Sequence, residues 1–343
     1  MRKLLVAVFV LLFSITAVGL VFASSKEGSE KAGEVSTEDF KFLVTGVLHP
    51  YFEPMRDAVK DYQEATGITC AYRATKDFNQ EQANVIIEGM IPQGYNGYAM
   101  WPGHPVSVNV TITELVDQGF PVVLIAGPAE LPTDASFCIA TDVKASAMKA
   151  TENLIQAMGE KGNIVNLLGA LSDPNTVLRK EGVEEVVSGY PDVKIIGEIA
   201  DIDAFEAATT KIDSFLGARA DEVDGMVATA YVPTVVATEA LIDMGDKRIK
   251  FVGIDDDAKV IQAIRDGYIT GTMTQSPYGQ AYVGLEVLRL LKLGYTPKEG
   301  HYFIDSGSFM VSKDNIDEYK EIIKQNAVEM LETFEGAHLN PPE

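Results

Sequence analysis

Short apolar runs alternate with segments of helical period along most of this chain, and glycine or proline bounds each of them. The first apolar run, residues 41–47, is followed by a helical pattern at 53–65 that ends before Gly67. Such alternation is typical of βαβ units, in which neighbouring strands are parallel and helices cover the sheet. The sequence therefore predicts an α/β fold built on doubly wound parallel sheets.

The pattern continues through the chain and divides it into two similar halves. In the first half it predicts strands at 41–47, 68–74, 98–101, 122–126 and 137–140, with helices at 53–65, 79–90 and 108–118. In the second half it predicts a helix at 144–158, strands at 163–168, 194–199, 225–229, 251–254 and 269–273, and helices that begin near residues 176, 205, 233 and 258. Two last helices, 278–293 and 316–334, flank strand-like pieces at 302–304 and 309–311. Because 343 residues exceed the about 250–300 that one core organises, we expect two lobes.

The start of the chain has the three parts of a secretory signal peptide, namely basic residues, an apolar stretch and a small residue, Ala23, before a polar sequence. We predict that residues 1–23 are cleaved off and that the protein is exported to the periplasm. An uncleaved membrane anchor is the alternative, because the stretch approaches the about 20 apolar residues that a span requires. Residues 24–38 are rich in glycine, serine and glutamate without periodicity, which predicts a disordered linker.

The charge of the chain argues against several classes of partner. It carries 50 Asp and Glu against 28 Lys and Arg, a net charge of −22. Non-specific nucleic-acid binding depends on neutralising phosphates with basic side chains, and this chain has no basic cluster that could do so. Anionic membrane surfaces are disfavoured for the same reason. With 46% hydrophobic residues, the chain has the composition of an ordinary globular protein.

Two cysteines, Cys70 and Cys138, fall in strands that the predicted topology places at opposite sides of one sheet. With three strands between them at a spacing of about 4.8 Å, they lie roughly 19 Å apart. A disulfide requires Cα atoms about 4.4 to 6.8 Å apart. We therefore predict two buried thiols, even though an exported chain meets an oxidising compartment.

The sequence lacks the common motifs of metal and catalytic sites. Its four histidines are scattered, with neither HExxH nor a Cys-His spacing of zinc type. Glycine-rich phosphate loops and the GxSxG nucleophile elbow do not occur either. We therefore predict no metal, no cofactor and no catalytic residues, and we expect a binding protein rather than an enzyme.

Aromatic residues gather where predicted strands end. In open parallel sheets, ligands bind outside the carboxyl ends of the strands. His49, Tyr51 and Phe52 follow the first strand, and the only tryptophan, Trp101, ends the third. Two adjacent aromatic residues cannot both face one helix stripe, so one of them faces a groove or solvent. Flat rings bury the apolar C–H faces of a sugar at little cost in side-chain entropy.

Polar candidates follow strands of the second half. Arg179 lies one turn into the helix after Asp173. From there its N–H donors could reach over the strand ends to two hydroxyl oxygens of a ligand. The alternative is an arginine on the surface, solvated by water. Asp255 is the residue nearest the strand in an acidic triplet, in which at least one carboxylate caps the next helix. Tyr231 and Gln275 also follow strands.

In this order and spacing, these residues resemble the type I periplasmic sugar-binding proteins, the ribose-binding-like solute receptors of ABC transporters, from about residue 40 to 317. The resemblance rests on five stretches of sequence, at residues 49–52, 178–182, 251–255, 271–277 and 311–316. LacI-type repressors share the two lobes but begin with a helix-turn-helix, where this chain has a predicted signal peptide.

The resemblance implies that the chain crosses a hinge three times, near Asp142, Gln275 and Ser306. The first lobe then comprises 39–142 plus 275–306 and the second 143–274 plus 307–334, with a tail at 335–343. Together with Tyr231, the positions that match the family's ligand contacts form the predicted site: His49, Tyr51, Phe52, Trp101, Arg179, Tyr231, Asp255 and Gln275.

The chain departs from ribose-binding relatives at three places. Those relatives have an Asp-Arg pair at Ala126-Gly127, an asparagine at Ala230 and an aromatic residue at Ile202. The resemblance therefore implies a roomier and less polar pocket, for another monosaccharide, a deoxy sugar or a polyol rather than ribose.

We expect a monomeric receptor that closes over its ligand by hinge rotation and delivers it to the permease of an ABC importer. A chemoreceptor is left open as a further partner. A membrane-tethered sugar sensor and a secreted α/β enzyme are the alternative functions.

Overall fold

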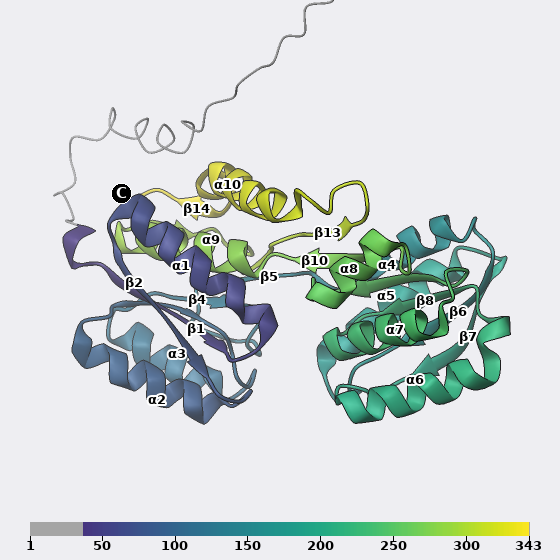
Figure 1. Ribbon diagram of the computed structural model, residues 1–343. Coiled ribbons are helices and arrows are strands. Elements are labelled where there is room, and N and C mark those ends of the chain that lie inside the picture. The colour runs from purple at the N-terminus through teal and green to yellow at the C-terminus, as the bar shows by residue number, and fades with distance from the viewer. Residues whose placement is uncertain (1–36, 343) are drawn as a thin grey trace, which may run out of the picture. The chain divides into compact units, whose positions relative to one another are not determined.

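The computed structural model describes residues 37–342 (Figure 1). The predicted signal peptide and almost all of the predicted linker lie outside the described residues. The end of that linker belongs to a short 3-10 helix, Thr37–Asp39. Among residues 37–342, no helix combines the length and the apolar character needed to cross a bilayer.

A sheet of six parallel strands forms the centre of the first lobe, with the order β12-β5-β4-β3-β1-β2. Its strands are β1 (Lys41–Val47), β2 (Thr69–Thr75), β3 (Gly97–Met100), β4 (Val122–Ile125), β5 (Phe137–Ala140) and β12 (Phe303–Asp305). The strands β3, β4 and β5 are buried along their whole length, as expected for a sheet covered on both faces.

The second lobe contains another six-stranded sheet, with the order β13-β10-β9-β8-β6-β7. Its strands are β6 (Gly162–Leu167), β7 (Val193–Ile199), β8 (Gly225–Ala228), β9 (Lys250–Ile254), β10 (Gly271–Gln275) and β13 (Ser308–Val311). Only the edge strand β13 runs antiparallel to its neighbour, β10. The predicted pair of α/β lobes with parallel sheets is confirmed.

Helices cover both faces of each sheet (Figure 1). On the first lobe these are α1 (Glu53–Thr66), α9 (Pro277–Lys292) and α10 (Tyr319–His338) on one face, and α2 (Gln80–Met90) and α3 (Val108–Asp117) on the other. On the second lobe, α4 (Val143–Ala157) and α5 (Pro174–Ser188) lie opposite α6 (Phe205–Arg219), α7 (Tyr231–Met244) and α8 (Ala258–Asp266). Local signals explain some helix ends: Asn79 caps α2, and Gly67 ends α1 at φ 74°.

The chain passes between the lobes at three places. It leaves the first sheet after β5, returns between β10 and α9, and leaves again between β12 and β13. The residues at these crossovers are Thr141 and Asp142, Ser276, and Ser306 and Gly307.

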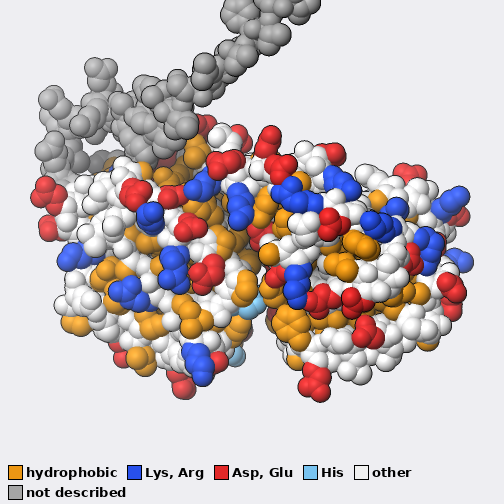
Figure 2. Space-filling view, viewed as in Figure 1, with side chains coloured by type: hydrophobic (Ala, Val, Ile, Leu, Met, Phe, Trp, Pro, Cys, Tyr) orange, Lys and Arg blue, Asp and Glu red, His pale blue; other side chains and the backbone are white. Residues whose placement is uncertain are grey.

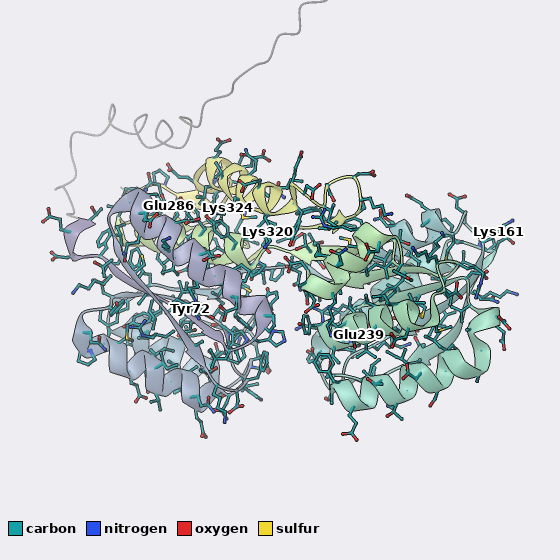
Figure 3. The ribbon with its side chains drawn as sticks, viewed as in Figure 1. Tyr72, Lys161, Glu239, Glu286, Lys320 and Lys324 are labelled. Carbon is teal, nitrogen blue, oxygen red and sulfur yellow. The ribbon has the colours of Figure 1, made fainter. Side chains whose placement is uncertain are left out.

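The last helix corrects the expected division of the chain. The sequence assigned 307–334 to the second lobe. The strand β13 and Tyr319, the first residue of α10, do belong there, but the rest of α10 lies beside α9 over the first lobe (Figure 1). Its residues Ala327 and Phe334 are buried in the first-lobe core, and the ammonium of Lys324 contacts Asp61 of α1 at 2.8 Å. Figure 3 shows Lys324 together with Glu286 of α9 on this lobe. The apolar stripe of a helix does not say which of two lobes it covers.

The predicted tail, 335–343, contains regular structure within its described residues, 335–342. Its first residues continue α10, and β14 (Leu339–Asn340) pairs with β11 (Thr296–Pro297). The C-terminal segment is therefore attached to the loop that follows α9.

Both cysteines are free, and three strands separate them in the sheet, as predicted. Cys138 on β5 is fully buried, whereas Cys70 on β2 is only partly buried, which corrects the expectation of two buried thiols. Cys70 lies on the edge strand of the sheet, where one side has no neighbouring strand. Burial raises the pKa of each thiol to about 12, so both stay protonated at neutral pH.

We expect Phe334→Ala to lower the free energy of unfolding by about 3 kcal/mol or more, because it leaves a cavity in the first-lobe core. Phe334 is 1% exposed, and its ring centroid lies 5.3 Å from that of Phe137 on β5. The matched control is Val328→Ala on the same helix, where the side chain is 36% exposed. Urea denaturation of both variants measures the difference; similar values for the two would contradict the placement of α10.

Candidate functional site

A cavity of about 420 Å³ lies between the carboxyl ends of the two sheets. Residues of both lobes line it, and they include every residue of the site predicted from sequence: His49, Tyr51, Phe52, Trp101, Arg179, Tyr231, Asp255 and Gln275. They come together because the parallel strands of each lobe end at the same edge of the sheet.

The wall on the first lobe is aromatic. Phe52 and Trp101 are almost fully buried, and their rings meet edge to face with centroids 5.9 Å apart. Phe78, which follows β2, adds a third ring 5.5 Å from that of Trp101 and is itself 60% exposed. Phe52 and Trp101 form a rigid apolar surface, because buried aromatic side chains have few accessible rotamers, and the exposed ring of Phe78 extends this surface.

His49 and Tyr51 belong to the turn that follows β1 and also line the cavity. The Nδ1 atom of His49 accepts a hydrogen bond from the backbone N–H of Tyr51 at 3.2 Å, which caps the 3-10 helix Pro50–Phe52. Burial lowers the pKa of His49, so its imidazole is neutral at neutral pH. Its ring lies 5.3 Å from that of Tyr231, which belongs to the second lobe. The two aromatic rings therefore meet across the cavity.

The wall on the second lobe is polar and charged. Asp173, Asn175 and Arg179 come from the start of α5, and Asp203 from the loop after β7. The Nε atom of Arg179 is buried and has no hydrogen-bond partner among residues 37–342. Burial lowers the pKa of Arg179, and the nearby carboxylate of Asp255 opposes this, so the guanidinium stays charged. A buried donor without a partner costs about 1–3 kcal/mol, which a suitable ligand would recover.

Asp255 is held firmly between β9 and β10. Its backbone lies in the left-handed region, at φ 68°, where its N–H donates to the carbonyl of Met273 at 2.8 Å. The Nε2 atom of Gln275 donates to its Oδ1 atom at 2.9 Å. Burial raises the pKa of Asp255 to about 6, although the hydrogen bond from Gln275 and the charge of Arg179 both act to lower it.

The three carboxylates of the acidic triplet, Asp255, Asp256 and Asp257, have different partners. Asp256 accepts a hydrogen bond from the hydroxyl of Tyr319 at 3.0 Å. Asp257 accepts one from the hydroxyl of Tyr231 at 2.8 Å and also caps α8. The sequence predicted that one member of the triplet caps the next helix, and that member is Asp257. Asp255 is the member that lines the cavity.

Several residues that line the cavity were not predicted from the sequence, among them Phe78, Thr141, Asn175 and Asp203. Each follows the end of a strand by only a few residues or begins the next helix. The strand-end rule could have found Phe78, but nothing local marks an exposed phenylalanine in a loop as part of a site.

The three departures from ribose-binding relatives lie in two environments. Ala126 and Ala230 line the cavity, where their small side chains leave room. Ile202 is fully buried in the core of the second lobe and does not line the cavity. Ala126 also has a left-handed backbone, at φ 66°.

The described part of the chain contains no group of three or more His, Cys, Asp or Glu side chains placed to hold a metal ion. On the face shown in Figure 2, acidic and basic side chains are interspersed over both lobes.

A family model described as a periplasmic binding protein domain matches residues 40–296. The chain belongs to this family of periplasmic binding proteins. Membership makes it an extracytoplasmic binding protein rather than an enzyme.

Relatives and solved structures agree with this membership. The xylitol-binding protein of Mycolicibacterium smegmatis is 23% identical over 303 residues, which cover 88% of this chain and 83% of that protein. A D-apiose import binding protein of Actinobacillus succinogenes is 24% identical over 259 residues, which cover 75% and 83% of the two chains.

In fold, the chain is similar to an arabinose binding protein from Geobacillus stearothermophilus, with a TM-score of 0.74 and 20% identity over 82% of this chain and 99% of the other. An ABC transporter solute binding protein from Burkholderia graminis, solved with D-arabinose, gives a TM-score of 0.72 and 21% identity over 83% and 99%. Both solved structures confirm the two-lobed fold expected for this binding-protein family.

We expect the stability of the ligand-free protein to depend on pH through Asp255. Because folding raises its pKa from 3.8 to about 6, the protonated form stabilises the fold below pH 3.8, and this contribution is lost as the pH rises through about 6. Asp255→Asn removes the titration, and asparagine tolerates a positive φ. The variant should therefore be more stable than the wild type at about pH 7, by a margin that shrinks at about pH 4.

Urea denaturation of both proteins at the two pH values measures this margin. Asp213→Asn, which changes an exposed carboxylate on α6, is the control. An equal margin at both pH values would mean that Asp255 does not titrate in this window.

Proposed function

We propose that this protein captures a neutral monosaccharide or a related polyol in the cavity between its lobes and delivers it to an ABC importer. One observation carries the proposal: an aromatic wall on one lobe faces a wall of hydrogen-bonding groups on the other, across a single cavity. Its volume falls within the range of about 300–1,000 Å³ that is usual for small-molecule sites. Sugars and polyols have this same division between C–H faces and hydroxyl edges.

The polar wall fits hydroxyl groups in particular. A hydroxyl can donate to a carboxylate and also accept from a guanidinium. Arg179 offers a buried donor without a partner, and no donor among residues 37–342 contacts the second carboxylate oxygen of Asp255. A ligand with two neighbouring hydroxyls would satisfy both groups at once, whereas a ligand without them would leave buried polar groups unpaired.

The charges around the cavity favour a neutral ligand over an acidic one. Three carboxylates, those of Asp173, Asp203 and Asp255, face the cavity, against the single guanidinium of Arg179. Like charges at short range in a poorly solvated site repel strongly, so a sugar acid or a sugar phosphate would bind poorly. A neutral sugar only replaces the water around these groups.

The relatives support ligands of small size. Their names record xylitol, D-apiose and arabinose, which are five-carbon polyols or sugars. The small Ala126 and Ala230 in this cavity support a ligand with fewer hydroxyl contacts than ribose receives in its own receptors. We infer that the physiological ligand is a five- or six-carbon sugar, a deoxy sugar or a polyol.

Closure of the lobes would be the event that the importer detects. The three crossovers allow the lobes to rotate toward each other, so that the aromatic and polar walls enclose the ligand. We propose that the protein acts as a monomer and that the closed form docks a membrane permease; a chemoreceptor would read the same closed form.

We expect a panel of neutral pentoses, hexoses and polyols to include at least one that stabilises the protein in a thermal-shift assay. The same compound should change the fluorescence of Trp101, the only tryptophan in the chain, because its ring lines the cavity. The matching sugar acid should give no shift at equal concentration. Stabilisation by a nucleoside or an amino acid alone would contradict the proposal.

We expect Arg179→Ala and Asp255→Ala each to weaken binding of that ligand by about 10- to 100-fold, the usual effect of losing a hydrogen bond to a charged group. Both variants should remain folded without ligand. Each removes a group that is unpaired or costly in the empty cavity, and for Asp255→Ala this gain offsets the strain of an alanine at a positive φ. Isothermal titration measures the affinities. Arg265→Ala and Asp213→Ala, on the surface of the second lobe, are the controls, and wild-type affinity in both cavity variants would place the site elsewhere.

We also propose that the protein reaches the periplasm through cleavage after Ala23. The amino-terminal pattern of the sequence supports this, together with an extracytoplasmic family. Mass spectrometry of protein purified from its own cells should give a chain that begins at Ser24. An intact Met1 would instead favour the tethered sensor.

A further inference from the structure

One buried amide connects the cavity to all three crossovers of the hinge. The side chain of Gln280, in the first turn of α9, is 0% exposed. Its Oε1 atom accepts a hydrogen bond from the hydroxyl of Tyr51 at 3.0 Å. Its Nε2 atom donates to the hydroxyl oxygens of Ser306, at 2.9 Å, and of Thr141, at 3.3 Å.

Each partner of this amide comes from a different part of the hinge. Thr141 lies on the first crossover, after β5, and Ser306 lies on the third, after β12. Gln280 itself follows the second crossover, and its backbone N–H donates to the carbonyl of Ser276 there at 2.9 Å. The hydroxyls of Thr141 and Ser306 are also 3.4 Å apart. All three crossovers therefore meet at one hydrogen-bonded cluster.

The sheets alone would not hold the three crossovers together. On the first-lobe side, β12 pairs with β5, which joins the first and third crossovers. On the second-lobe side, β13 pairs with β10, which joins the second and third. The second crossover has no sheet partner on the first-lobe side, because the chain enters α9 directly. Gln280 supplies the missing connection at that point.

Tyr51 extends the cluster into the cavity. Its ring lines the cavity, while its hydroxyl is committed to Gln280 rather than to solvent. A ligand that packs on this ring therefore acts on a group whose other end is bonded to the hinge. Neighbouring hydrogen bonds in a buried network strengthen one another, so a shift of one member is felt by the rest.

We propose that Gln280 is the positioning residue of the hinge: it fixes the first-lobe ends of the three crossovers as one unit and couples Tyr51 in the cavity to that unit. Closure then takes place by rotation on the second-lobe side of the cluster, where Gly307 has φ 77°. The proposal rests on the proposed function only in assuming that the lobes close on a ligand.

If Gln280 only stabilised the fold, its replacement would lower the free energy of unfolding without changing the angles that the lobes sample. Loss of a buried hydrogen-bonded amide lowers stability wherever it occurs. Loss of a hinge connection also widens the range of angles that the two lobes sample. The width of the distribution of interlobe distances therefore separates the two roles.

The test measures that width in ligand-free protein by double electron–electron resonance. Spin labels at Glu88→Cys on α2 and Asp213→Cys on α6 report the distance between the lobes, in a background with Cys70→Ser so that the partly buried thiol takes no label. We expect Gln280→Met to give a distribution at least twice as wide as that of the unsubstituted labelled protein. Thr238→Val, which removes a buried hydroxyl within α7, is the control for lost stability and should keep the narrow distribution.

Two further variants, Ser306→Ala and Tyr51→Phe, test the hinge connection and its coupling to the cavity separately. If Gln280→Met does not fold, Ser306→Ala removes one partner of the amide and should widen the distribution by a smaller factor. Tyr51→Phe keeps the ring and the hinge cluster, so it should keep the narrow distribution without ligand and weaken binding of D-xylose, xylitol or D-arabinose, whichever binds, by about 5- to 10-fold.

A narrow distribution in both Gln280→Met and Ser306→Ala, with only a lower free energy of unfolding, would overturn the proposal. Wild-type affinity in Tyr51→Phe would overturn the coupling between cavity and hinge. If none of the three probes binds to the wild type, the proposed function fails for these ligands, while the ligand-free distances still decide the role of Gln280.

Discussion

The common direction of parallel strands is the constraint on which the rest of this structure depends. Because all strands of a parallel sheet end at the same edge, each lobe collects its strand-end loops on one side. The three crossovers then set these two edges opposite each other around a single cavity. Residues as distant in sequence as His49 and Gln275 become neighbours in one site for this reason alone. Loop residues can change without disturbing the sheets, which is how relatives at 23 to 24% identity keep the fold while their names record different ligands.

The site is built from groups that are unfavourable in the empty protein. Arg179 keeps a buried donor without a partner, and Asp255 keeps a carboxylate whose pKa burial has raised to about 6. Both are held in place by structure around them: α5 carries the arginine, while the backbone between β9 and β10 holds the aspartate at a positive φ. A ligand that supplies the missing hydrogen bonds removes these costs, so the free energy stored in the empty cavity contributes to selectivity.

The two lobes use equivalent positions in different ways. The strands β4 and β9 hold the same place in their sheets, and each is followed by a residue in the left-handed region, Ala126 in one lobe and Asp255 in the other. A left-handed backbone is usual for aspartate or asparagine and strained for alanine. The first lobe thus presents a methyl group where the second presents a carboxylate. This difference agrees with the apolar character of the wall on the first lobe and the polar character of the wall on the second.

The sequence by itself determined the two α/β lobes and part of the cavity lining, because strand and helix periods are local and strand ends are where such folds bind ligands. His49 and Trp101 could be named from their positions after strands, whereas Arg179 and Asp255 were favoured only through the resemblance to a known family. The separation of Cys70 and Cys138 followed from the strand order. Only the tertiary structure decided that α10 covers the first lobe, that Phe78 joins the aromatic wall, and that Gln280 meets Thr141, Ser306 and Tyr51. These outcomes depend on packing between segments far apart in the chain, and an apolar stripe or a single amide has no local signal that identifies its partner.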